Sequence, residues 1–143
     1  MKNIAIYISF LMITSSFCGC GSANGNVKEE KTSVTSADKI EVYYFHYTRR
    51  CATCTAVEEQ TQRILKQLYQ DELNNKKVSF QSINLDEASS EEVAKKLGVS
   101  GQTLLIVSGD QKENITTDAF MYAKSNPDKL KEVIKKNMDS FLN

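Results

Sequence analysis

Two different patterns meet in residues 40–54, which read Ile40-Glu-Val-Tyr-Tyr-Phe-His-Tyr-Thr-Arg-Arg-Cys-Ala-Thr-Cys54. The first seven residues are mostly β-branched or aromatic, and they predict a strand that ends at His46. After Cys54 the apolar residues fall close to one face of a helix that we expect to reach about Gln70. These apolar residues are Val57, Ile64, Leu65, Leu68 and Leu73. A Cys-x-x-Cys pair therefore stands where a strand passes into a helix.

The position of Cys51, at or just before the expected helix N-terminus, favours a reactive thiolate. Unpaired backbone N–H groups and the helix dipole stabilise negative charge there, and Arg49 and Arg50 add positive charge beside it. The pKa of such a thiol falls from about 8.5 to between about 3.5 and 7.5. We therefore predict that Cys51 is the exposed nucleophile and that Cys54, one turn into the helix, resolves the mixed disulfide.

The residues alone leave two other interpretations of the pair open. A purely structural disulfide suits an exported protein, although a two-residue loop closes little chain entropy. The other alternative is a binding module in which Cys51 and Cys54 chelate a soft metal or a trivalent metalloid, with His46 as the candidate third ligand. His46 is also a candidate for proton handling or for a buried, hydrogen-bonded structural histidine.

The remaining patterns extend one α/β domain over residues 39–143. Alternation predicts a strand over 77–85, and a helix capped by Ser89 or Ser90 is expected to end at Gly98. The continuous apolar run 103–107 predicts a strand buried on both faces. A turn at 108–110, a short strand around 114–117 and a helix that starts at Asn126-Pro127 follow. The inner face of that last helix should carry Leu130, Val133, Ile134, Met138 and Phe141.

Composition narrows the classes of partner. The 143 residues leave room for one ordinary domain. Lys and Arg together number 18, and so do Asp and Glu. This balance gives no reason to expect nucleic acid or an anionic membrane surface as a partner.

The start of the chain has the pattern of an export signal: one early lysine, a short apolar run and then small residues. Its end resembles a bacterial lipoprotein signal, because Gly19 stands just before Cys20. Phe17 departs from the aliphatic residue usual there, so cleavage without a lipid is the alternative. We predict a lipoprotein signal peptide over 1–19, lipidation of Cys20 and a flexible tether over 20–38. The domain would then be exported and lipid-anchored to a membrane, facing the periplasm.

Three segments resemble the thioredoxin-like fold family, and the resemblance covers roughly Ile40 to Asn143. They are the strand that leads to the Cys-x-x-Cys pair, the strand end Ile83-Asn-Leu-Asp86, and the run Leu97-Gly-Val-Ser-Gly-Gln-Thr-Leu-Leu-Ile106. The resemblance implies a central mixed β-sheet flanked by helices, with Thr103 facing the cysteine pair. Where the family has a cis-proline before this threonine, the sequence has Gln102. That departure favours the chelating alternative, because the cis-proline discourages metals from binding the thiols.

A narrower similarity is to small bacterial proteins named as nitrophenyl compound nitroreductase subunit, ArsF family. It is carried by Tyr-Tyr-Phe-His46, Thr-Arg-Arg-Cys-Ala-Thr-Cys54 and Ser-Gly-Gln-Thr-Leu-Leu105. The name implies electron delivery in a nitroreductase system. We predict a thiol–disulfide oxidoreductase or electron carrier with no cofactor beyond its redox-active disulfide. Its partner would be a protein thiol or disulfide, such as a membrane electron carrier or a reductase subunit. The predicted site residues are Cys51, Cys54, Thr103, Arg50, Arg49 and His46.

Overall fold

The computed structural model of the chain describes residues 39–142. The predicted signal peptide over 1–19, the lipidation at Cys20 and the tether over 20–38 lie outside the described residues. Within residues 39–142, no helix combines the length and the apolar character needed to cross a membrane.

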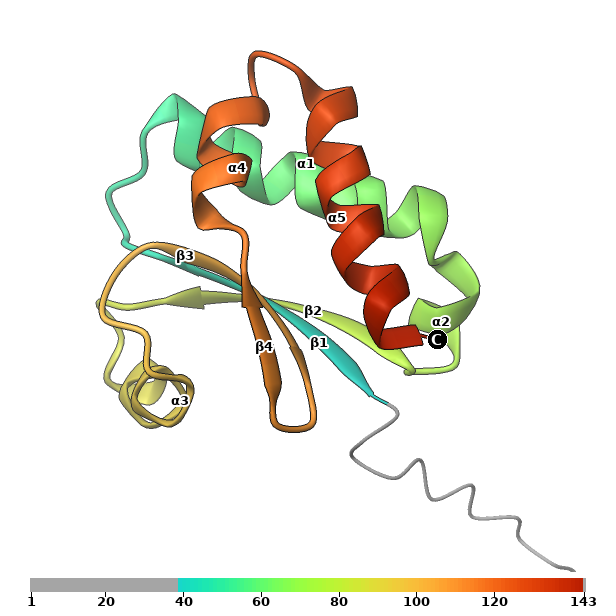
Figure 1. Cartoon of the computed structure of the whole chain (residues 1–143). Helices are drawn as coiled ribbons and strands as arrows, with labels where there is room; N and C mark the ends of the chain where they lie inside the picture. The colour runs from blue at the N-terminus through green and yellow to red at the C-terminus, as the bar shows by residue number, and fades with distance from the viewer. Residues whose placement is uncertain (1–38, 143) are drawn as a thin grey trace, which may run out of the picture. The chain divides into compact units, whose positions relative to one another are not determined.

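A sheet of four strands in the order β2-β1-β3-β4 forms the centre of the domain (Figure 1). Strand β1 (Ile40–His46) pairs in parallel with β2 (Val78–Asn84) and antiparallel with β3 (Thr103–Ser108). Strand β4 (Gln111–Asn114) pairs antiparallel with β3 along one edge. The sheet is therefore mixed, as predicted, and the strand that precedes the cysteines lies inside it.

Alternation along β1 sends side chains to two separate cores. Val42 and Tyr44 belong to the larger apolar cluster, together with residues of the helices that cover that face. Tyr43 and Phe45 belong to the smaller cluster on the opposite face. Because successive strand side chains point to opposite faces, Tyr44 and His46 project toward the same side. That side is covered by the helix that starts at the cysteines.

Helices cover both faces of the sheet. Helices α1 (Ala52–Leu68), α4 (Thr116–Tyr122) and α5 (Pro127–Leu142) lie over one face, and α3 (Glu91–Leu97) lies under the other (Figure 1). The short helix α2 (Gln70–Asn74) and a 3-10 turn, η2 (Ala88–Ser90), complete the elements. This strand order, with a helix between β1 and β2 on one face and α3 on the other, is the α/β thioredoxin-like fold.

Most of the predicted elements are present with shifted ends. Strands β1 and β3 match the prediction, and β3 is buried along its whole length. The inner face of α5 is confirmed, with Leu130, Ile134 and Met138 fully buried. Gly98 ends α3 in the left-handed region at φ 73°.

The predicted elements differ from the structure in three details: a misplaced strand, a helix that was not predicted and the capping of α3. The strand expected around 114–117 lies at Gln111–Asn114, because the turn at Gly109 is tight and Ser108 already pairs with Gln111. Residues Thr116–Tyr122 form helix α4 instead. Ser90 occupies the N-cap position of α3, as predicted, but its side chain makes no capping hydrogen bond. Its hydroxyl donates instead to the carbonyl oxygen of Glu87 at 2.7 Å.

Candidate active site

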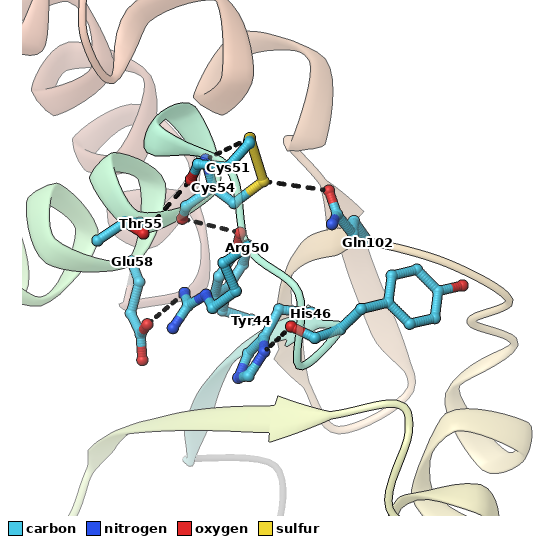
Figure 2. A network of polar contacts seen from close by, with 9 residues as sticks. Tyr44, His46, Arg50, Cys51, Cys54, Thr55, Glu58 and Gln102 are labelled. Atoms are coloured by element: carbon cyan, nitrogen blue, oxygen red, sulfur yellow. Dashed lines mark hydrogen bonds and ion pairs between the residues drawn. A yellow bond between two sulfur atoms is a disulfide. The ribbon is translucent and has the colours of Figure 1, made fainter.

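The two cysteines form a disulfide at the N-terminus of α1 (Figure 2). Cys51 is the N-cap residue, and its sulfur accepts a hydrogen bond from the backbone N–H of Cys54 at 3.1 Å. Cys51 is exposed, whereas Cys54 is only 3% exposed. Cys51 therefore lies at the helix start as an exposed residue, the position expected of the nucleophile, and Cys54 lies behind it in the core.

The surroundings of Cys51 favour negative charge on its sulfur. The N–H of Cys54 points at that sulfur, and the first turn of α1 carries no acidic residue. A hydrogen bond to the charged form and the positive end of the helix dipole both lower a thiol pKa. After reduction, the same arrangement therefore stabilises the Cys51 thiolate.

Tyr44 ties the first turn of α1 to the middle of the sheet. Its buried hydroxyl donates to the carbonyl oxygen of Cys54 at 2.9 Å. The guanidinium carbon of Arg50 lies 5.5 Å from the centre of the Tyr44 ring. Burial raises the pKa of the Tyr44 hydroxyl, so Tyr44 is a neutral hydrogen-bond donor at physiological pH.

Arg50 turns toward the interior and forms an ion pair with Glu58, one turn beyond Cys54 on α1 (Figure 2). Burial alone would raise the pKa of Glu58, but hydrogen bonds from Ser82 and Arg50 and the positive charge of Arg50 hold it below its usual value of 4.5. Glu58 is thus ionised at neutral pH. Its carboxylate compensates the charge of Arg50, so the positive charge that we expected Arg50 to add beside Cys51 is paired within the site.

His46 and Arg49 do not gather around the sulfurs. The imidazole of His46 points away from the disulfide (Figure 2), and its Nδ1 lies 3.0 Å from the carbonyl oxygen of Tyr47. Arg49 is exposed. Within residues 39–142, no three His, Cys, Asp or Glu residues come together as a metal site. The third ligand suggested for the chelating alternative is therefore not in place.

Gln102 makes the contact with the cysteine pair that was expected of its neighbour Thr103. Its side-chain oxygen Oε1 lies 3.7 Å from the sulfur of Cys54 (Figure 2). The hydroxyl of Thr103 donates instead to the carbonyl oxygen of Gly101 at 2.9 Å. That bond spans Gln102, so Thr103 acts on the site by holding the loop from which Gln102 projects. No peptide bond within the described residues is cis.

The loop between β1 and α1 is fastened to the end of β2. The carboxylate of Asp86 accepts the backbone N–H of Thr48 at 2.8 Å, and the side-chain amide of Asn84 donates to the Thr48 hydroxyl at 2.9 Å. The N–H of Leu85 also donates to the carbonyl of His46 at 2.7 Å. These bonds fix the path of the chain just before the cysteines.

Sequence reasoning did not assign roles to several of these residues. Tyr44 was treated as a strand residue only, although its face was readable from the alternation around it. Glu58 lies four residues after Cys54, which places it on the same side of the helix, and that spacing was a usable signal. The contacts of Asp86 with Thr48 and of Gln102 with Cys54 join segments 38 and 48 residues apart. No local sequence pattern predicts these two contacts.

No protein-family model and no curated protein matches the chain. Among solved structures, it is similar to the thioredoxin of Malassezia sympodialis, with 25% identity, a TM-score of 0.46, and 72% of this chain and 78% of that chain covered. It is also similar to the germline-specific thioredoxin protein Deadhead of Drosophila melanogaster, with 20% identity and a TM-score of 0.46 over 71% of this chain and 83% of that chain. The Fasciola hepatica thioredoxin gives 18% identity with the same TM-score and coverage. The narrower similarity to nitroreductase subunits finds no support in these comparisons.

Proposed function

We propose that the protein is a thiol–disulfide oxidoreductase or electron carrier in which Cys51 exchanges disulfides with a protein partner and Cys54 resolves the mixed disulfide. The observation that carries the proposal is the pairing of an exposed sulfur at a helix N-terminus with a buried sulfur one turn later. A structural disulfide needs neither the exposure of Cys51 nor an N–H directed at its sulfur.

The exchange proceeds in two balanced steps. The Cys51 thiolate attacks one sulfur of the partner disulfide, and the other partner sulfur leaves with the electron pair and takes up a proton. The Cys54 sulfur, deprotonated, then attacks Cys51, and the second partner sulfur leaves in the same way. One disulfide is broken in the partner and one is formed here, so two electrons pass to the partner. Run backwards, the same steps oxidise a dithiol partner.

The proposal includes a location and a partner class. The signal peptide predicted over 1–19 and the lipid predicted at Cys20 would place the exchange at a membrane, facing the periplasm. Electrons would then come from a membrane or periplasmic thiol carrier. The sequence similarity to nitroreductase subunits suggests that a reductase subunit accepts these electrons.

The test uses the full chain equilibrated in glutathione buffers of graded potential, followed by thiol alkylation. Trypsin releases residues 51–63 as one peptide, which holds both active-site cysteines and neither Cys18 nor Cys20. Its mass reports the state of this pair alone. We expect a single two-electron transition between about −270 and −120 mV. A pair that stays oxidised or reduced across that range would contradict the proposal.

Replacement of Cys54 separates exchange from chelation. In the Cys54→Ser chain, Cys51 keeps its exposure and its N-cap position, so mixed disulfides with the partner should accumulate. The matched Cys51→Ser chain should form none with a protein partner, because the remaining sulfur is too deeply buried for a protein disulfide to reach it. A chelator would lose its ligand in both variants and accumulate mixed disulfides in neither.

A further inference from the structure

Within residues 39–142, the side chain of Gln102 reaches the resolving sulfur of Cys54 from outside helix α1. Gln102 Oε1 lies 3.7 Å from the Cys54 sulfur, and Gln102 itself is half-buried. The backbone after it is fixed, because Thr103 pairs with Phe45 in the sheet and its hydroxyl closes the turn onto Gly101. Gln102 is therefore the last loop residue before β3, and the paired strand that follows anchors its backbone next to Cys54.

The neighbouring polar groups make their contacts away from the Cys54 sulfur. Tyr44 donates to the carbonyl of Cys54, not to its sulfur. Arg50, from the loop before α1, is paired with Glu58 of α1. The Cys51 sulfur is the reaction partner and accepts the N–H of Cys54. The side-chain amide of Gln102, by contrast, contacts the Cys54 sulfur directly, so it is in place to pair with that sulfur when the disulfide is reduced.

A carboxamide suits both protonation states of a thiol. Its oxygen accepts from an S–H group, and its NH₂ group donates to a thiolate. The last torsion of a glutamine side chain is broad and roughly two-fold, so the two ends exchange places by a simple rotation. Because burial raises the pKa of a thiol, a donor turned toward Cys54 is what a buried resolving thiolate lacks.

We propose that Gln102 is the positioning residue of the resolving step: its amide oxygen holds the Cys54 thiol, and its amide NH₂, after rotation, stabilises the Cys54 thiolate that attacks Cys51. This inference rests on the proposed exchange function. The Cys54 proton passes to water before attack, and Gln102 itself gains and loses no proton. The bond between Cys54 and Cys51 forms as the bond from Cys51 to the partner sulfur breaks, and the electron pair leaves on the partner sulfur.

The first test measures the pKa of the Cys54 thiol in full-length Cys51→Ser chains, from the pH dependence of its alkylation rate read on tryptic peptide 51–63. Gln102→Leu removes both amide ends, and we expect the pKa to rise by about one unit, the equivalent of tenfold. Gln102→Glu keeps the shape but supplies a negative acceptor, so the pKa should rise further. Gln67→Leu, an exposed glutamine on α1, is the matched control and should leave the pKa unchanged.

The second test follows resolution in chains that keep both cysteines. The reduced full chain is mixed with oxidised glutathione, and samples are quenched with acid at intervals. Mass spectrometry of peptide 51–63 then measures how much of it carries the glutathione adduct and how much the internal disulfide. Gln102→Leu should prolong the life of the adduct about tenfold near neutral pH, since fewer Cys54 thiolates are present. The Gln67→Leu chain should resolve at the rate of the unaltered protein.

The outcomes of these tests distinguish a failure of the role proposed for Gln102 from a failure of the proposed thiol–disulfide exchange. If the unaltered chain resolves its adduct and Gln102→Leu does so at the same rate with an unchanged Cys54 pKa, the role of Gln102 is refuted while exchange stands. If Gln102→Glu lowers the pKa of Cys54 relative to Gln102→Leu, the donor role is refuted as well. If the unaltered chain never resolves an adduct at Cys51, the proposed function itself fails.

Discussion

The hydroxyl of Tyr44 donates a hydrogen bond of 2.9 Å to the carbonyl oxygen of Cys54, and this bond joins the central strand of the sheet to the first turn of α1. It is buried, and it sits directly behind the residue whose sulfur faces Gln102. The resolving cysteine is therefore positioned from two sides. Tyr44 of β1 binds the backbone of Cys54, and Gln102 of the loop before β3 contacts the Cys54 sulfur.

Removing this bond should weaken the fold measurably. Tyr44→Phe keeps the ring and loses only the hydroxyl, so we expect the free energy of unfolding to fall by about 1 kcal/mol. Urea denaturation of the oxidised chain measures the change. Tyr122→Phe is the matched control, because the Tyr122 hydroxyl makes no hydrogen bond to any residue in 39–142, and it should cost much less. Equal losses in the two variants would show that the bond to Cys54 contributes nothing of its own.

The ion pair between Glu58 and Arg50 predicts a pH dependence with a defined sign. The pKa of Glu58 is lowered in the folded chain, so ionised Glu58 stabilises the folded state. This contribution is fully present above the ordinary pKa of 4.5, and it is lost as the pH falls through the lower pKa of the folded chain. The difference in unfolding free energy between the unaltered chain and Glu58→Gln should be of order 1 kcal/mol at pH 7. It should shrink toward pH 3.

Urea midpoints at the two pH values provide that comparison. The pKa values of Glu41 and Asp139 are lowered as well, but both groups are present in both chains, so their contributions cancel in the difference. A difference that grows as the solution is acidified would reverse the sign argued for Glu58.

The fastening of the loop by Asp86 predicts a local effect on backbone dynamics. Asp86→Ala removes the acceptor of the Thr48 N–H, so we expect faster hydrogen exchange at residues 48–50 and a small loss of stability, about 0.5 to 1.5 kcal/mol. Asp110→Ala, in the exposed turn before β4, removes a carboxylate without touching this loop and serves as the control. Unchanged exchange at Thr48 in Asp86→Ala would mean that the Asp86 carboxylate does not contribute to holding the loop.

The end of α3 offers a clean pair of glycine substitutions. Gly98 adopts φ 73°, and a Cβ there meets nothing within 4 Å, so the cost of Gly98→Ala is one of backbone conformation alone. We expect a loss of about 1 to 2 kcal/mol, seen as a lower thermal midpoint. Gly101→Ala is the control: its φ is outside the left-handed range and its Cβ would lie 4.0 Å from the Tyr47 hydroxyl. A midpoint lowered more by Gly101→Ala would contradict this account.

The parts of the fold that were readable from sequence are those where local chemistry and tertiary packing agree. β1 and β3 are rich in apolar residues, and the structure buries most of β1 and all of β3. Cys51 at the start of α1 follows from the strand-to-helix junction. Helix α4 was missed because only Ala119 among its residues is fully buried, and its threonines and aromatics carry little helix propensity. Packing against α5 and β3, not local preference, sets its conformation.

The candidate site was predictable to a similar extent. The two cysteines and their different exposure follow from one short motif. The inward orientation of the Arg50 side chain does not follow from that motif, because it depends on contacts with Glu58 and with the ring of Tyr44. An arginine next to a cysteine indicates positive charge near a thiol only if no carboxylate reaches it first.

The outer edge of the sheet also limits how copies of the domain can associate. All four residues of β4 are exposed, and they include Lys112 and Glu113. An edge strand presents unpaired backbone groups that invite strand addition from another chain, and charged side chains oppose it. The ammonium of Lys112 is also held 3.5 Å from the carbonyl oxygens of Lys96 and Leu97 at the end of α3. The β4 edge is therefore protected against the edge-to-edge pairing that leads to aggregation.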